Sequence, residues 1–399
     1  MTTREMAQHT DTTMDASGAR VRVCHLCLGH DADDARVFHQ FCTALSEAGY
    51  EVHLFATRAQ VPNTSDVIVH EVVAASSRVR RAGQAWKIAR DARALHPAIM
   101  HVHEPILFGP AVTMRGDAQV IWDVHEDYLE VAKARHWIPG PLRRPLMVWW
   151  KWNEERLLKK SAAVVVANPP YLERYRHLNR RAMVLANFPD PKPEAPRDPG
   201  TVPTAVYTGT ILPNRGLSET VEAIGIARSR GTDIRLSIAG PSSEDGYMET
   251  VMARAEELGL GDLVTYYGRL PRNEALALQR RATMGVVPHL PVGNNLNAWS
   301  VKMIEFMEAG LPLVYSDIPS HRQTVLDDEV GISVDARDPS QIATAMIDLA
   351  ADPGRSARLG ANGRAVVLDR LNWSKEKRRL VALYQEILAD GPRAARRRP

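Results

Sequence analysis

The sequence has few cysteines and no long apolar run. Its three cysteines, Cys24, Cys27 and Cys42, cannot form a disulfide framework, and no second ligand pair follows Cys24-x-x-Cys27 at the spacing of a zinc site. We interpret them as reduced, mostly buried thiols of a cytosolic protein. No segment approaches the roughly 18 apolar residues of a membrane span, and the first twenty residues lack the apolar core of a signal peptide. We therefore expect a cytoplasmic protein that contacts the inner face of a membrane at most peripherally.

The chain also lacks a strong net charge. A net charge of +3 over 399 residues provides no overall field for nucleic acid, so we expect no nucleic-acid partner. With 45% hydrophobic and 24% charged residues, the chain is typical of a globular protein rather than a disordered one. Its length indicates two or three domains, each able to bury a core.

The first half of the chain alternates between strand and helix patterns. This order is typical of an open α/β sheet with parallel strands, whose ligands bind where the strands end. The expected strands are 21–28, 51–57, 67–73, 99–103, 120–124, 162–167 and 183–186, and the expected helices are 37–48, 84–95 and 146–160.

A proline-rich stretch separates this half from a second alternating half. Residues 187–200 contain five prolines and cannot form a regular element, so they predict a semi-stiff connector. In the second half the expected strands are 204–208, 234–239, 264–267, 285–288, 311–315 and 332–334, and the expected helices are 217–230, 248–258, 272–281, 301–309, 339–351, 353–369 and 373–389.

The pattern predicts an α/β protein with two Rossmann-like, doubly wound domains that face each other across a cleft. The predicted parts are a disordered tail (1–20), an N-terminal Rossmann-like domain (21–188), a proline-rich linker (189–203), a C-terminal Rossmann-like domain (204–370), a final helical segment (371–390) and a basic tail (391–399).

The segment 300–317 combines a capped helix with a buried strand. Lys302 and Glu305 lie three residues apart near the start of this helix. A carboxylate can accept hydrogen bonds from two ribose hydroxyls, while an ammonium and free backbone N–H groups bind phosphate. An ordinary exposed ion pair is the alternative on spacing alone.

The loop after the expected strand 204–208 carries a second candidate. Gly209 would let a ligand approach the backbone, and Arg215 could bind phosphate with two donors. The glycine spacing fits neither a dinucleotide fingerprint nor a P-loop, so a β-turn with a surface arginine stays open.

Histidines and acids end two strands of the first half. His101-x-His103 places both rings on one strand face and is similar to the start of some hydrolase metal sites, but two doubly wound domains disfavour that reading. We expect instead that one histidine of the segments His101–Pro105 and Asp123–Tyr128 is a hydrogen-bonding or acid–base group.

The acidic loop Asp31-Ala-Asp-Asp34 has two readings. Its oxygens could hold a divalent ion, or the loop could be solvated with Asp34 paired to Arg36. The second interpretation is favoured.

Taken together and in order, these segments resemble the family 4 retaining glycosyltransferases of the GT-B fold, from about Val21 to Leu388. The resemblance rests on Val301–Pro312, the loop from His30 to Arg36, Asp123-Val-His-Glu-Asp, and Asn372-Trp-Ser. Within this family, the first-domain motifs are similar to those of a bacterial branch that makes surface polysaccharides and natural products.

The resemblance implies a role for each matching residue. Glu305 would bind the ribose hydroxyls, Arg215 and Lys302 the donor diphosphate, and His125 the hydroxyls near the reacting carbon. The catalytic set is then His125, Arg215 and Lys302; the donor-binding set is Gly209, Thr210, Asn297 and Glu305; and the acceptor and loop set is Gly29, His30, Asp34, Arg36, His103 and Glu126.

The resemblance further implies a nucleotide-diphospho sugar as co-substrate, with no other cofactor and no metal. The acceptor would be a small molecule, a glycan or a lipid-linked intermediate. It would bind the domain 21–188 and the nucleotide sugar the domain 204–370, and the closing helix in 371–390 would cross back to the first domain. The departing phosphate oxygen would take the acceptor proton, so no protein nucleophile is needed.

Two positions depart from the family pattern. Asn297 stands where the family's fuller motif has a second glutamate, and Thr210 where many members have an arginine. These departures motivate the alternative of a non-catalytic GT-B protein that binds a nucleotide sugar or stabilises a partner.

The stretch 143–153 places three tryptophans beside basic residues. It could lie at a membrane interface, or form a core helix whose rings pack beneath the sheet. The succession of apolar residues favours the core helix.

Overall fold

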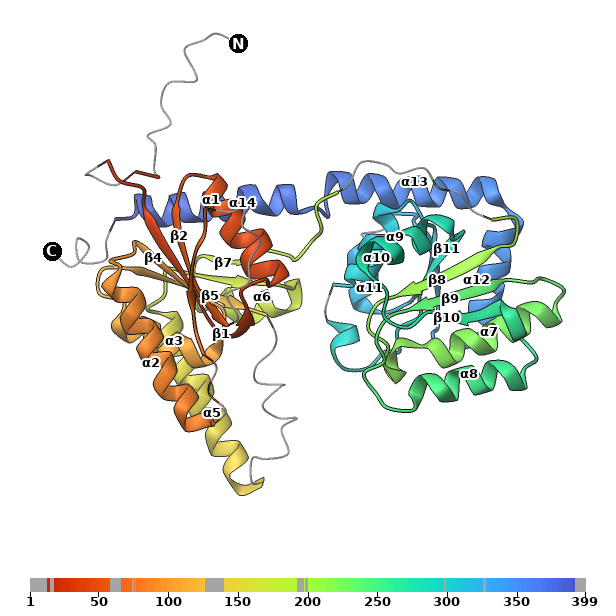
Figure 1. The fold of residues 1–399 in the computed structure, drawn as a ribbon, viewed down its shortest axis with the longest axis horizontal. Helices are drawn as coiled ribbons and strands as arrows, with labels where there is room; N and C mark the ends of the chain where they lie inside the picture. The colour runs from red at the N-terminus through yellow and green to blue at the C-terminus, as the bar shows by residue number, and fades with distance from the viewer. Residues whose placement is uncertain are drawn as a thin grey trace, which may run out of the picture. The chain divides into compact units, whose positions relative to one another are not determined.

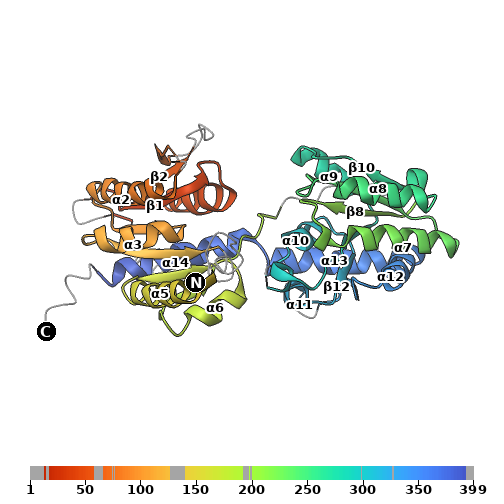
Figure 2. The same cartoon turned by 90° about the horizontal axis from the view of Figure 1, so that it is seen from below.

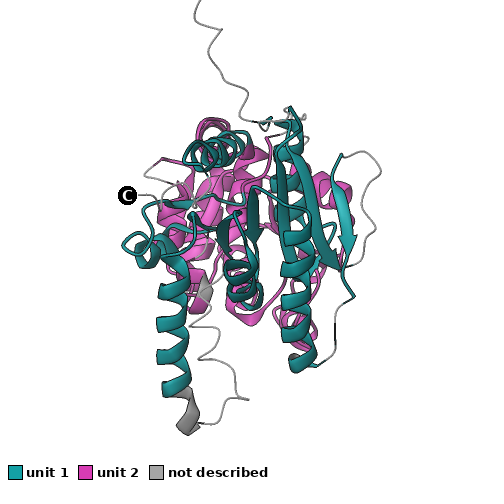
Figure 3. Cartoon of the chain, turned by 90° about the vertical axis from the view of Figure 1, so that its left-hand side faces the viewer, with its two compact units in different colours: residues 1–187, 374–399 teal, residues 188–373 magenta. Residues whose placement is uncertain are grey.

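The computed structural model describes residues 13–14, 18–57, 66–73, 75, 77–125, 140–191, 197, 200–297, 299–325 and 328–391. The chain divides into two compact units, unit 1 (Met1–Asn187 with Ser374–Pro399) and unit 2 (Phe188–Trp373) (Figures 1 and 3). Each unit is built on one parallel sheet, which confirms the predicted α/β class with two doubly wound sheets. Among the described residues, no helix combines the length and the apolarity that crossing a bilayer requires.

The sheet of unit 1 has the order β3-β2-β1-β4-β5-β6-β7, and every pair is parallel. The chain order reverses between β1 and β4, which is where open α/β sheets bind ligands. The strands are β1 (Arg22–Asp31), β2 (Glu51–Thr57), β3 (Ile68–Glu71), β4 (Ile99–Val102), β5 (Gln119–Val124), β6 (Ala163–Val166) and β7 (Ala182–Val184). The helices are η1 (Ala35–Cys42), α1 (Thr43–Glu47), α2 (Arg78–Ala94), α3 (Pro105–Met114), α5 (Gly140–Leu158), α6 (Pro169–Tyr175) and α14 (Trp373–Ala389).

The sheet of unit 2 has the order β10-β9-β8-β11-β12-β13 and is also parallel, with helices on both faces (Figure 2). The strands are β8 (Thr204–Thr208), β9 (Arg235–Ala239), β10 (Val264–Tyr266), β11 (Met284–Val287), β12 (Leu313–Ser316) and β13 (Gly331–Val334). The α-helices are α7 (Leu217–Ser229), α8 (Tyr247–Glu257), α9 (Arg272–Arg281), α10 (Val301–Glu308), α11 (Pro319–Val325), α12 (Pro339–Ala351) and α13 (Pro353–Asp369); the 3-10 turns are η2 (Pro213–Arg215), η3 (Gly261–Leu263) and η4 (Gly293–Leu296).

The central strands β4, β6, β11 and β12 are fully buried, because helices cover both faces of each sheet. In unit 1 the core centres on Trp122 and Phe108, whose ring centroids lie 3.9 Å apart. The three cysteines are free and buried, which confirms the prediction of unpaired thiols.

The region after β1 differs from its prediction. β1 continues to Asp31 instead of ending at residue 28, and the expected helix 37–48 is a π-helix, η1, followed by α1. Asp34 starts η1, because its carboxylate accepts hydrogen bonds from the backbone N–H groups of Arg36 and Val37. π-helical turns are rare and are frequent at functional sites.

Three short helices were not predicted, namely α3, α6 and α11. Each begins with a proline, at Pro105, Pro169 and Pro319. Proline fits the first helical position because its missing N–H would have no partner there, so these prolines mark helix starts rather than loops.

The close pairing of β12 with β13 gives a prediction for stability. A Cβ atom at Gly331 would lie 2.0 Å from the backbone oxygen of Leu313 on the neighbouring strand. We expect Gly331→Ala to lower the free energy of unfolding by about 1–3 kcal/mol, measured as a fall in Tm. Gly354→Ala is the control, because its Cβ would make only an ordinary 3.4 Å contact. Equal Tm values for the two variants would contradict this account.

Candidate functional site

A cavity of about 350 Å³ lies in unit 2, where β8 and β9 end. Gly209 follows β8 and Gly240 follows β9, so both glycines stand at the carboxyl edge of the sheet. The lining residues are Thr208, Gly209, Thr210, Ala239, Gly240, Pro241, Arg269, Leu270, Arg272, Ala275, Leu276, Gln279 and Glu305. The structure thus brings the predicted residues Gly209, Thr210 and Glu305 together around one cavity.

Lys302 lies directly over Gly209, one of the residues that line this cavity. A Cβ atom at Gly209 would lie 1.4 Å from the Lys302 Nζ, so only glycine leaves room for the lysine. The backbone φ of Gly209 is also +121°, which disfavours other residues. Burial lowers the pKa of Lys302 to about 8; Glu305 opposes this shift and Arg215 adds to it.

Arg215 ends the 3-10 turn η2 and is held by two side chains that sequence reasoning missed. Its Nη1 donates a hydrogen bond of 2.8 Å to Asn295 Oδ1 and lies 3.3 Å from His289 Nδ1. Asn295 is itself fixed, because its Nδ2 donates to the carbonyls of Asn214 and Leu290 at 2.9 Å each. Burial lowers the pKa of His289 well below its usual value, so the positive charge here comes from Arg215 and Lys302.

The two departures from the family motif occupy exposed positions. The Thr210 side chain is exposed at the cavity, while its carbonyl accepts a 2.9 Å hydrogen bond from Tyr207. Asn297 is exposed just after η4 and does not line the cavity. The buried amide beside Arg215 belongs to Asn295, two residues earlier.

Arg269 and Leu270 also line the cavity and were missed. Their signal was their place after β10, at the same sheet edge as Gly209 and Gly240. With Lys302 near Gly209 and a carboxylate at Glu305, the cavity can hold an anionic group together with a hydroxyl-bearing one.

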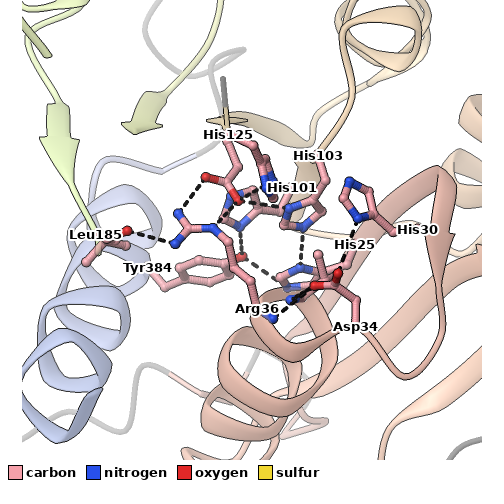
Figure 4. A network of polar contacts seen from close by, with 11 residues as sticks. His25, His30, Asp34, Arg36, His101, His103, His125, Leu185 and Tyr384 are labelled. Carbon is pink, nitrogen blue, oxygen red and sulfur yellow. Dashed lines mark hydrogen bonds and ion pairs between the residues drawn. The ribbon is translucent and has the colours of Figure 1, made fainter. Parts of the chain in front are cut away.

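In unit 1, a buried polar cluster surrounds Asp123 at the end of β5 (Figure 4). Arg36 donates two hydrogen bonds to its carboxylate, from Nε to Oδ2 (3.0 Å) and from Nη2 to Oδ1 (2.8 Å), and a third from Nη1 to the Leu185 carbonyl (2.8 Å). His103 Nδ1 lies 3.0 Å and His125 Nε2 2.9 Å from Asp123 Oδ2.

Arg36 and His103 are buried, and their assignment as acceptor and loop residues stays a prediction. The preferred ion pair of Asp34 with Arg36 is wrong, because the Arg36 guanidinium binds Asp123 and Asp34 accepts a hydrogen bond from the backbone N–H of Arg36. A buried carboxylate needs such a partner, whereas Asp34 can be satisfied by backbone N–H groups. His125 does reach the surface, with 18% of its side chain exposed.

The loop residue His30 lies beside this cluster. Its Nδ1 is 3.3 Å from Asp34 Oδ2, and its ring centroid is 5.2 Å from that of His125. The hydrogen bond with Asp34 raises the pKa of His30 against the effect of burial. Burial would raise the pKa of Asp34, but His30 and the backbone N–H groups of η1 hold it below its usual value.

Gly29 is held by a residue that sequence reasoning did not single out. Glu104 Oε1 accepts hydrogen bonds from the N–H groups of Leu28 (2.8 Å) and Gly29 (2.6 Å). The predicted acceptor residue Glu126 lies outside the described residues.

Comparison with known families gives two adjoining matches. Residues 35–192 match the family described as Glycosyltransferase Family 4, and residues 190–366 match that described as Glycosyl transferases group 1.

Two relatives are mycobacterial. The chain is 31% identical over 187 residues to a GDP-mannose-dependent alpha-(1-6)-phosphatidylinositol monomannoside mannosyltransferase of Mycolicibacterium smegmatis, covering 46% of this chain and 48% of that protein. The match therefore spans about half the length of this relative. The chain is 23% identical over 376 residues to a glycogen synthase of Mycobacterium tuberculosis, covering 85% of this chain and 87% of that one.

Solved structures share the fold. A glycosyltransferase from Rickettsia africae has a TM-score of 0.71 at 14% identity, covering 92% of this chain and 98% of its own. A sucrose-phosphate synthase from Thermosynechococcus elongatus has a TM-score of 0.69 at 19% identity, covering 93% and 100%. Because the two family matches together span residues 35–366 and the fold agrees, this chain belongs to glycosyltransferase family 4, with the GT-B fold.

Proposed function

We propose that this protein is a retaining hexosyltransferase that moves a sugar from a nucleotide-diphospho sugar to an acceptor hydroxyl. The observation that carries the proposal is the unit 2 cavity, where Glu305 lines the wall and Lys302 lies over Gly209, with Arg215 fixed by Asn295. Two cations and a carboxylate in a partly buried site suit a nucleoside diphosphate.

Each of these groups has a task in the proposed reaction. Glu305 accepts hydrogen bonds from the ribose hydroxyls and thereby places the nucleotide. Lys302 and Arg215 stabilise the negative charge that develops on the departing diphosphate, and they do so more strongly in a site partly shielded from water. The acceptor hydroxyl attacks from the face that the diphosphate leaves, and a phosphate oxygen takes its proton.

Unit 1 supplies the acceptor side in this proposal. His125 is the partly exposed member of the Asp123 cluster, and its ring offers a nitrogen to a sugar or acceptor hydroxyl. We propose an acceptor within polysaccharide, glycolipid or natural-product synthesis. The names of two relatives support this range, since one acts on a phosphatidylinositol mannoside and the other is a glycogen synthase.

We further propose that unit 1 rests on the surface of an anionic membrane. The favoured prediction of a core helix around residues 146–153 is wrong, because α5 exposes Val148 (70%), Trp149 (54%) and Trp152 (56%). Lys151 and Arg156 are exposed on the same helix. Exposed tryptophans beside basic residues are typical of a helix that lies at a lipid interface.

The position of α5 supports a lipid-linked acceptor. Figure 1 shows that α2 and α5 lie on the same side of unit 1 and extend toward the same end of it. α2 begins there with exposed Val79, Arg80 and Arg81. Helices of a parallel α/β sheet start at the edge where the strands end, which is also the edge of His125. A lipid surface bound here would bring its headgroups to the acceptor side of the unit.

The donor site is tested first by nucleotide binding. We expect one of UDP, GDP, dTDP and ADP to raise the Tm, because a ligand at a hundred times its Kd adds about 2.7 kcal/mol of stability. Glu305→Gln keeps the side-chain shape but loses the charge, so it should reduce this shift. Glu249→Gln on the exposed face of α8 is the control and should keep it.

Two results would count against the proposal. An unchanged shift in Glu305→Gln would remove this residue from the donor site. A nucleotide shift without turnover of the matching nucleotide sugars, either by hydrolysis or with any acceptor, would favour the non-catalytic alternative.

Lys302 gives donor binding a dependence on pH. With a pKa of about 8 in the free protein, its ammonium is present below pH 8 and lost above it. The affinity for the nucleoside diphosphate should therefore stay level from pH 7 to 8 and fall above, by at most about tenfold per pH unit. Calorimetric titrations at pH 7.0 to 9.5 measure this. Lys302→Arg stays charged and should bind with no such fall; a level affinity in the wild type up to pH 9.5 would contradict the role of Lys302.

Membrane contact is tested by sedimentation with vesicles. We expect the protein to sediment with phosphatidylglycerol vesicles and not with phosphatidylcholine vesicles. Replacing Trp149 and Trp152 with Ser should weaken this binding, whereas Tyr267→Ser, which changes an exposed aromatic residue of unit 2, should not. Binding that the tryptophan changes leave intact would assign the interaction to another surface.

A further inference from the structure

A chain of polar side chains runs through the interior of unit 1 from His125 to Tyr384 on α14 (Figure 4). Its members lie on or just after β1, β4 and β5 and on the distant C-terminal helix, and among them only His125 is partly exposed. The proposed transfer reaction uses His125 and leaves the role of the buried members unexplained.

This chain of hydrogen-bonded side chains contains one charged group, Asp123. Burial would raise the pKa of this carboxyl group, but Arg36, His125 and His103 outweigh that effect and hold it well below its usual value. The group is therefore a carboxylate, which only accepts hydrogen bonds. His103, whose Nδ1 lies 3.0 Å from Asp123 Oδ2, must carry its proton on Nδ1.

That proton sets the direction of the next two contacts. Burial lowers the pKa of His103 and of His25, so each ring is neutral and has one N–H group. His103 Nε2 is then an acceptor, and His25 Nδ1 donates to it at 3.0 Å. His25 Nε2 is in turn an acceptor, and the hydroxyl of Tyr384 donates to it at 3.3 Å.

The last contact follows by the same rule. Burial raises the pKa of Tyr384, so its hydroxyl keeps the proton that it donates to His25. Its oxygen accepts from His101 Nδ1 at 2.8 Å. Among the described residues, His101 Nε2 has no hydrogen-bond partner, which makes this ring the end of the chain.

The same histidines have the spacing of a metal site. One nitrogen from each of His25, His101 and His103 lies within 4.8 Å of the other two. The hydrogen bonds described above already give His25 and His103 a partner on both ring nitrogens. An ion bound between the rings would have to break such contacts, so the hydrogen-bond chain accounts for these buried groups better.

We propose that Tyr384, His25 and His103 are positioning residues for His125, which they hold through Asp123. The chain keeps Asp123 Oδ2 in place, with His125 Nε2 2.9 Å away. Among the described residues, His125 Nε2 has no hydrogen bond of regular geometry, and its 2.9 Å contact with Asp123 Oδ2 is an ion-pair contact. This contact favours the tautomer with the proton on Nε2, which leaves Nδ1 to accept a hydrogen bond from a substrate hydroxyl. The C-terminal helix α14 thus takes part in setting the orientation of a residue at the end of β5. This inference rests on the proposed transferase function.

The first test reads the proton positions directly and needs no turnover. In protein labelled with ¹⁵N-histidine, long-range ¹H–¹⁵N spectra distinguish the two tautomers of each ring. We expect Nδ1–H for His25, His101 and His103, and Nε2–H for His125, with signals assigned from single His→Gln variants. Nε2–H at either His25 or His103 would break the chain and overturn the proposal.

The second test measures transfer after removal of one oxygen. Tyr384→Phe should lower kcat by about tenfold, the effect of one hydrogen bond, and should leave the KM for the donor unchanged because the donor cavity lies in unit 2. Tyr175→Phe is the matched control, since it removes another buried hydroxyl of unit 1, bonded to Glu154 at 3.1 Å. It should keep the wild-type kcat.

The outcomes separate this inference from the proposed function. A Tyr384→Phe variant with wild-type kcat and tautomers would overturn the positioning role while leaving the transferase intact. A wild-type protein with the expected tautomers but no turnover would instead refute the transferase function and with it the catalytic use of His125. Should Tyr384→Phe fail to fold, the tautomers of the wild type still decide whether the chain exists.

Discussion

All strands of each sheet run parallel, so the loops after the strands gather at one edge, and the candidate residues depend on this constraint. Gly209 and Gly240 meet around one cavity because β8 and β9 are neighbours. In unit 1, β4 and β5 are neighbours, and His103 and Asp123 meet just where they end. Neither group would form if a strand of the pair ran the other way.

The candidate sites of the two units contain charged groups of opposite sign. Unit 2 places the cations Lys302 and Arg215 near its cavity, and burial there lowers the pKa of Lys302. Unit 1 buries an anion, Asp123, and satisfies it with Arg36 and His103. The excess of positive charge from Lys302 and Arg215 suits the unit 2 site to a phosphate ligand. The Asp123 carboxylate, whose hydrogen bonds are satisfied within the protein, is instead suited to hold neighbouring groups in place.

The departures from the family motif are partly offset by the local structure. The amide of Asn295, which no motif marked, holds the Arg215 guanidinium, and Gly216 lets the chain turn closely beside Pro288, whose oxygen would lie 1.9 Å from an added Cβ. An arginine fixed in this way needs less ordering when it meets a phosphate. Although Thr210 replaces an arginine of the family motif, Arg215 is therefore still held in place for its proposed contact with the donor.

The sequence by itself determined the alternation of strands and helices, because the spacing of apolar residues is a local property of each element. It also indicated Gly209, Arg215, Lys302 and Glu305, since each lies in a strand-end loop or at the start of the helix in the motif 301–312. The helix at 373–389 was predicted with the bounds that α14 has.

Only the tertiary structure decided which distant residues meet. Arg36 binds Asp123 across 87 positions, and Tyr384 meets His25 across 359, pairings that no local pattern contains. The exposure of Trp149 and Trp152 could not be predicted from the sequence either. The sequence pattern of an apolar helix is the same whether or not other elements cover it. Local periodicity encodes an element, whereas the order of strands in the sheet decides what surrounds it.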